Sequence, residues 1–224
     1  MKPPSSTGSK PQSDSKQEHL LASASSKVLI HKINDSVPIS IVNEPHSGWE
    51  IGAVAWSHNN LIIATCGEND CQIALAKVAD GSIIQEMEVC PKGVSITDVC
   101  FSSKSTFMAF GCDDSSVGIV NIRQKRVETA IRDHDPAYSI RSVSFNCYDS
   151  LLASASSDGE LIVNALTPNE ESETQIANRI FRDRSMRSPL TMCRFSFIKR
   201  HVLATSYESG LVCIWDLTQV VAAA

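Results

Sequence analysis

From Glu18 onward, short apolar runs alternate with small clusters of Ser, Asn, Asp and Gly. Runs of this length between turn-forming residues predict β-strands. Four of the runs share one template, in which an apolar strand ends in an aromatic residue followed by Ser or Asn. The template copies cover residues 52–57, 96–102, 140–146 and 190–196. Their aromatic positions, Trp56, Phe101, Phe145 and Phe195, lie 45, 44 and 50 residues apart, which indicates an internal repeat.

Each template copy is followed by a turn and a second predicted strand of mostly small residues. These second strands cover 61–66, 106–112, 151–156 and 201–206, and an earlier copy at 19–25 lacks its preceding strand. Third strands are predicted at 28–33, 73–78, 117–122, 161–166 and 211–217, and weaker fourth strands include 82–89 and 126–131. The additional residues before Phe195 fall in 168–174, which we interpret as an extended loop. Four antiparallel strands in each repeat predict the blades of a β-propeller, in which small residues favour close approach of neighbouring sheets.

The organisation along the chain follows from this repeat. Residues 1–17 are rich in Pro, Ser and Lys and are predicted to be a disordered lead. Residues 18–220 form the predicted propeller, and residues 221–224 form a tail. Because the first copy starts at its second strand and the fifth stops after its third, we expect an all-β, incomplete propeller. It would hold about four and a half blades, which leaves apolar blade faces uncovered.

Composition narrows the classes of partner. The formal net charge of −5 argues against nucleic-acid binding by the whole surface. No apolar run reaches membrane-spanning length, and the first residues lack the apolar middle of a secretory signal, so we expect a soluble cytoplasmic or nuclear protein without membrane partners. The eight cysteines contain no Cys-x-x-Cys pair and are interpreted as reduced thiols. Five of them fall in predicted strands: Cys66, Cys100, Cys112, Cys193 and Cys213.

The segment Leu203–Leu217 resembles the closing half of a WD repeat, and Leu152–Gly159 is similar to the same region. The resemblance implies a WD40 propeller, usually a seven-bladed ring, with a hydrogen-bond network of Ser, His, Asp and Trp in each blade. The fourth copy matches this network at His134, Ser156 and Asp158, with Asn164 in place of the Trp. A Trp-Asp pair occurs in the last copy, at Trp215-Asp216. The network is therefore expected to be incomplete, and apolar packing to carry more of the stability.

A closer resemblance is to the propeller of the GCP-WD family, the adaptors of the γ-tubulin ring complex at centrosome and spindle. The similar segments are 116–127, 133–134, 146–150, 157–162 and 197–200. The resemblance implies a cytoskeletal role in microtubule nucleation during mitosis, with the propeller directing the adaptor to the centrosome or spindle. In that family the segment that binds the ring complex lies C-terminal to the propeller.

The alternative function is a substrate receptor or scaffold of a ubiquitin ligase or another multiprotein complex. Such receptors often carry Trp-Asp-x-Arg after a third strand. Here Thr218 stands where the Arg is expected after Trp215-Asp216, and Arg123, which has the right offset, follows Val120-Asn121. The scaffold related to the γ-tubulin ring complex is therefore the preferred hypothesis.

A basic run gives one candidate partner-binding patch in this acidic protein. It contains four arginines and one aspartate between residues 179 and 187: Arg179, Arg182, Asp183, Arg184 and Arg187. Guanidinium groups suit carboxylate and phosphate, so the run predicts docking of an acidic or phosphorylated partner; the alternative is a solvated outer strand. Ser185, three residues after Arg182, is a candidate phosphorylation site.

Two aromatic residues are further candidates for partner binding. Trp49 and Tyr138 fall in the loops that lead into first strands, where they would anchor a partner or pack against their own loops.

The sequence shows no constellation of catalytic residues. It contains neither a Gly-x-Ser-x-Gly elbow nor a phosphate-binding loop, and its six histidines lack metal-ligand spacing. His46 and His134 occupy equivalent loop positions and are interpreted as structural hydrogen-bonding groups. The dipeptides Asp113-Asp114 and Asp158-Gly159 could hold a metal ion, but both are interpreted as tight turns. We therefore predict a protein that is not an enzyme and that uses no cofactor or metal.

Overall fold

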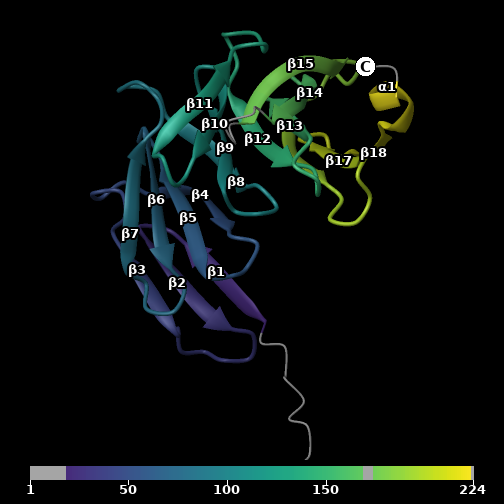
Figure 1. Cartoon of the computed structure of the whole chain (residues 1–224). Helices are drawn as coiled ribbons and strands as arrows, with labels where there is room; N and C mark the ends of the chain where they lie inside the picture. Colours follow the sequence, from purple (N-terminus) through teal and green to yellow (C-terminus); the bar gives the residue numbers. More distant parts are fainter. Residues whose placement is uncertain (1–18, 169–173, 223–224) are drawn as a thin grey trace, which may run out of the picture.

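The computed structural model describes residues 19–168 and 174–222, which form five antiparallel sheets arranged one after another in chain order (Figure 1). The first sheet contains β1 (Leu20–Ala24), β2 (Lys27–Lys32) and β3 (Ser40–Asn43). The second contains β4 (Ile51–Trp56), β5 (Ile62–Gly67), β6 (Gln72–Lys77) and β7 (Ile83–Glu88). The third contains β8 (Ile96–Phe101), β9 (Phe107–Cys112), β10 (Val117–Asn121) and β11 (Arg126–Ile131).

The fourth sheet contains β12 (Ile140–Phe145), β13 (Leu151–Ser156), β14 (Leu161–Pro168) and β15 (Thr174–Asp183). The fifth contains β16 (Leu190–Phe195), β17 (Val202–Tyr207) and β18 (Val212–Asp216), and a short helix, α1 (Thr218–Ala222), follows. Strands pair in sequence order within every sheet. The first strands β4, β8, β12 and β16 contact one another in turn, so the described residues form an incomplete β-propeller, as the repeat predicted.

Small residues in the second strands allow the sheets to approach closely. Strands β9 and β13 are almost entirely buried, as is β5 after its first residue. Gly111 in β9 shows why size matters, because a Cβ atom there would overlap the side chain of Ile140 in β12. The predicted role of small residues at these positions is confirmed.

Each interface between consecutive sheets holds its own apolar core. Between the second and third sheets, Leu75 and Met87 pack with Val99 and Phe110. The other three interfaces are built in the same way from buried Val, Ile, Leu and Ala residues. The free faces of the first and fifth sheets carry exposed apolar side chains: Leu21, Ile41, Met192, Val212 and Ile214. Burial against a neighbouring sheet is thus the main stabilising contribution in this fold.

Two predicted features are corrected by the structure. Strand β14 runs through Pro168 and β15 begins at Thr174, so both ends of the predicted loop 168–174 belong to strands. The extension is favourable because Leu166 and Ile176 pack against the core shared with the third sheet. Strand β3 and helix α1 were not predicted, since both are too short to show a clear period. The predicted lead, residues 1–17, lies outside the described residues.

The remaining expectations concern thiols and membrane spans. All eight cysteines are free, and Cys66, Cys112 and Cys193 are fully buried. Burial raises the pKa of the Cys66 and Cys193 thiols to about 12, so both stay protonated as small core residues. In the part of the chain that the structure describes, no helix has the length and apolarity needed to cross a membrane.

Candidate interaction face

A buried histidine holds the turns of the second sheet in place. His46, in the loop before β4, is bonded through Nδ1 to Asp70 Oδ2 at 2.7 Å and through Nε2 to Thr65 Oγ1 at 2.9 Å. Asp70 lies in the turn between β5 and β6, and its other oxygen accepts the Gln72 amide at 3.2 Å. The loop and the turn therefore form one rigid unit at this end of the sheet.

The fourth sheet repeats this arrangement with different residues. His134 Nε2 lies 2.8 Å from Ser154 Oγ, and Nδ1 lies 3.2 Å from Glu160 Oε2. The Glu160 carboxylate is fully buried and accepts the Nε hydrogen of Arg182 at 2.6 Å. Burial lowers the pKa of His134 to about 4, an effect that the nearby Asp158 opposes and the Arg182 charge reinforces. The imidazole is therefore neutral near pH 7.

Ser156 and Asp158, which the sequence placed in this network, do not contact His134. When β13 and β17 are aligned on Leu152 and Leu203, Ser154 and Thr205 occupy the same position. The histidine therefore contacts Ser154, nearer the middle of the strand, and not the serine at the strand end. Ser156 donates to the Ser139 carbonyl at 3.4 Å instead. Asp158 accepts the Glu160 amide at 3.1 Å and lies 3.0 Å from Arg184, and the Glu160 carboxylate lies beside His134 in the place expected for Asp158.

The fifth sheet has the tryptophan half of the network. Trp215 Nε1 donates to Thr205 Oγ1 at 2.9 Å, and its ring meets Phe181 edge to face at 5.5 Å between centroids. Asp216 accepts the amide and hydroxyl of Thr218 at 3.0 and 2.6 Å. In the third sheet the buried ring of Phe110 occupies the Ser/Thr position. Apolar packing replaces the network there.

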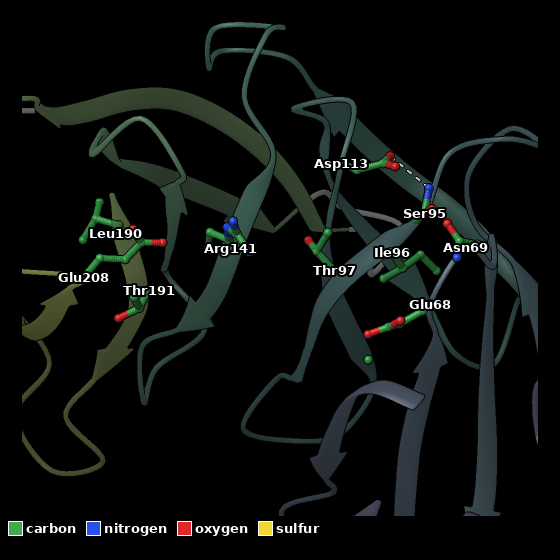
Figure 2. A pocket seen from close by; sticks show the side chains of 11 residues that line it. Glu68, Asn69, Ser95, Ile96, Thr97, Asp113, Arg141, Leu190, Thr191 and Glu208 are labelled. Atoms are coloured by element: carbon green, nitrogen blue, oxygen red, sulfur yellow. Dashed lines mark hydrogen bonds between the residues drawn. The ribbon is translucent and has the colours of Figure 1, made fainter. Parts of the chain in front are cut away.

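We call one end of the sheets the turn face. It consists of the turns between second and third strands and the loops that lead into first strands. A central recess of about 470 Å³ opens on it, lined by residues of the second to fifth sheets (Figure 2). Exposed acidic side chains line it at Glu68, Asp113 and Glu208, together with the exposed base Arg141. Asp113 Oδ1 also accepts the Ser95 amide at 2.9 Å.

A second, lateral recess of about 420 Å³ opens on the same face. Its lining combines Tyr138 from the loop before β12, Ser157 and Asp158 from the β13–β14 turn, and the loop after β15. The loop contributes Arg184 and Arg187, of which Arg184 Nη2 lies 3.0 Å from Asp158 Oδ2. Two arginines against one carboxylate make this recess basic in an acidic protein.

Comparison with known proteins agrees with this geometry. The family model described as "WD domain, G-beta repeat" matches residues 38–75, 81–121 and 125–163, more than half of the chain. The chain belongs to the WD40-repeat family. Each matched segment joins the last strand of one sheet to the first three strands of the next, so sheets two to four are WD40 blades.

Among individual WD40 relatives, the chain is 26% identical to human Protein NEDD1 over 196 residues, which cover 87% of the chain and 26% of that protein. The mouse NEDD1 protein is 26% identical over 83% of the chain. The WD repeat-containing protein 55 homolog of Aedes aegypti is 28% identical over 55% of the chain. The WD40 chain thus spans about a quarter of the length of these relatives. The resemblance to the GCP-WD family is confirmed, since NEDD1 is GCP-WD.

The WD40 fold brings together three of the six residues predicted to bind a partner. Tyr138, Arg184 and Arg187 line the lateral recess. Arg182 is bound to Glu160, while Arg179 on β15 and Trp49 in the loop before β4 are exposed outside the recess. Ser185 is exposed and donates to Asp183 Oδ2 at 2.9 Å, and its phosphorylation stays a prediction.

Sequence reasoning missed Glu160 and the exposed tip of the β16–β17 turn. Phe197 and Ile198 are 92% and 88% exposed, at the end of the WD40 blade opposite the turn face. The guanidinium of Arg200 stacks 5.5 Å from the ring centroid of nearby Tyr148. Glu160 gave no signal, because its burial depends on Arg182, a partner 22 residues away. Within the described residues, no group of three or more His, Cys, Asp or Glu side chains is placed to hold a metal ion.

Proposed function

We propose that this chain is a non-catalytic protein-interaction scaffold that directs a γ-tubulin ring adaptor to the centrosome or spindle. The observation that carries the proposal is the 26% identity to NEDD1 along 87% of the chain, with the resemblance to the γ-tubulin adaptors of the GCP-WD family. Because the chain spans about a quarter of these relatives, the proposed role is targeting. Binding of the ring complex belongs to segments outside the propeller in that family.

The turn face supports a role in partner binding for physical reasons. It holds two recesses, whose walls come from the sheets and from turns fixed by part-buried hydrogen bonds. A preformed concave surface loses little conformational entropy when a partner docks. Exposed Tyr and Arg side chains at such a surface are the residue types that contribute most to protein interfaces.

The proposal is tested by expressing the chain as a fluorescent fusion in dividing cells and measuring its enrichment over γ-tubulin foci. We expect enrichment at spindle poles relative to the fluorescent protein alone. Charge reversal at Arg141→Glu on the turn face is expected to reduce it at least threefold. The matched control is Lys104→Glu, an exposed residue in the β8–β9 turn at the other end of the sheets. Uniform cytoplasmic signal of a folded fusion would refute the proposal.

A further inference from the structure

The lateral recess collects hydrogen-bond donors from three separate segments. Arg184 and Arg187 come from the loop after β15, Ser157 from the β13–β14 turn and Tyr138 from the loop before β12. Arg187 is exposed and forms no ion pair among the contacts of the described residues. Its five N–H groups are therefore available to a ligand. Ser157 and Tyr138 add hydroxyl donors on the facing walls.

Asp158, the one carboxylate in the lining, orients an arginine, and its charge does not repel an anion bound in the recess. Its side chain is 2% exposed. One of its oxygens accepts the Glu160 amide at 3.1 Å, and the other lies 3.0 Å from Arg184 Nη2. Because both oxygens are engaged, Asp158 holds the Arg184 guanidinium at the recess while its own charge is compensated. Because the Arg187 charge is not compensated in this way, the lining has a net positive charge.

The recess is preformed by a backbone contact. Gly159, in the β13–β14 turn, has φ +88°, and a Cβ atom there would lie 2.6 Å from the Ser188 carbonyl oxygen and 2.8 Å from that of Met186. The turn therefore presses directly on the backbone of the arginine-bearing loop. Arg182, bonded to buried Glu160, anchors the start of the same loop. A loop whose backbone is already held in place binds a charged group with a smaller loss of conformational entropy.

We propose that the lateral recess binds a phosphoserine or phosphothreonine side chain of a partner protein, which rests on the scaffold function proposed above. A phosphate carries a charge near −2 and three acceptor oxygens, so it uses donors from several walls at once. A carboxylate has two oxygens and one charge and matches a single arginine fork. Phosphorylation of the partner would then control its capture.

The test uses the full chain and three immobilised peptide libraries of random flanking sequence, with phosphothreonine, threonine or glutamate at the fixed centre. We expect retention on the phosphothreonine library, at least tenfold above the other two. The enriched peptide is then measured by fluorescence anisotropy. Arg187→Glu is expected to raise its Kd at least tenfold, and Arg179→Glu, a matched reversal outside the recess, less than twofold. Thermal unfolding curves of both variants verify that they fold.

Three outcomes would overturn the inference. Equal retention on the glutamate library would mean that any anion suffices, and equal loss with Arg179→Glu would mean that overall charge, not the recess, binds the peptide. The proposed targeting function is separable from this test. If the folded chain is enriched at spindle poles and binds no phosphopeptide, the recess assignment fails and the scaffold function stands.

Discussion

Asp98 Oδ2 lies 3.3 Å from Arg194 Nη1, although the two residues belong to the third and fifth sheets. The same oxygen accepts the Val143 amide of the intervening fourth sheet at 2.8 Å. Arg194 also donates to the Val143 carbonyl at 3.0 Å. One buried carboxylate thus joins three consecutive first strands, β8, β12 and β16. This cross-link is the polar counterpart of the apolar cores between sheets.

Replacing Asp98 with alanine should therefore destabilise the fold. The change leaves the buried Val143 amide without its acceptor and removes the counter-charge of the partly exposed Arg194, at a cost of about 1–3 kcal/mol in the free energy of unfolding. Urea unfolding followed by circular dichroism measures it. Glu86→Ala, at an exposed position of β7, serves as the control and should change stability by less than about 0.5 kcal/mol. An Asp98→Ala variant as stable as the control would show that the cross-link contributes nothing.

Phe110 and Gly118 form a second testable pair, across strands β9 and β10. A Cβ atom on Gly118 would overlap the fully buried Phe110 ring, so Gly118→Ala should cost about 1–3 kcal/mol by overpacking. In a Phe110→Leu background the smaller side chain leaves room for the methyl group of Ala at position 118. The cost of Gly118→Ala in the free energy of unfolding should then fall below half of its value in the wild type. A double-mutant cycle in urea gives the coupling energy. Additive effects would disprove the contact.

Burial of His134 predicts a pH dependence of stability. Its pKa is lowered from 6.5 to about 4 in the folded state, so the unfolded chain binds its proton first as pH falls. The free energy of unfolding should then drop between about pH 6.5 and pH 4, by up to about 3 kcal/mol at about 1.4 kcal/mol per pKa unit. Urea titrations across this range measure it. His134→Gln should remove this component, whereas His58→Gln, at an exposed histidine, should retain it.

Gly159 and Gly210 offer a matched comparison for the lateral recess. Both occupy the turn between second and third strands, with φ of +88° and +83°, so alanine is strained at either position. A Cβ on Gly159 also meets two backbone carbonyls, while one on Gly210 meets nothing within 4 Å. Gly159→Ala should therefore lower the melting temperature more than Gly210→Ala does. Gly159→Ala should also weaken phosphopeptide binding, whereas Gly210→Ala should leave that binding unchanged. Equal effects of the two changes would mean that the strain of the turn alone, and not the contact with the arginine-bearing loop, causes the losses.

The sequence predicts the repeat because each blade needs the same arrangement of strands. Trp56, Phe101, Phe145 and Phe195 mark the ends of first strands as expected. What the pattern cannot supply is the reach of individual side chains across turns. Glu160 replaces Asp158 in the histidine network because a longer side chain and a distant arginine meet there.

The candidate site was predicted in part for the same reason. Arg184 and Arg187 of the basic run both line the lateral recess, and their role in partner binding stays a prediction. Tertiary contacts divide the rest of the run. Arg182 is bound to a buried carboxylate, and Arg179 is not one of the residues that line the recess. Charge counting along the chain treats these four residues alike, and only packing separates them.

We propose that this WD40 chain is a scaffold that binds its partners through the turn face. Proximity labelling in dividing cells tests it most directly, with the chain fused to a biotin ligase and γ-tubulin labelling quantified. We expect strong labelling by the wild type and by Lys104→Glu, and labelling at least threefold weaker by Arg141→Glu combined with Arg187→Glu. Absence of γ-tubulin labelling by the wild type, or equal labelling by all three, would refute a scaffold role of the turn face.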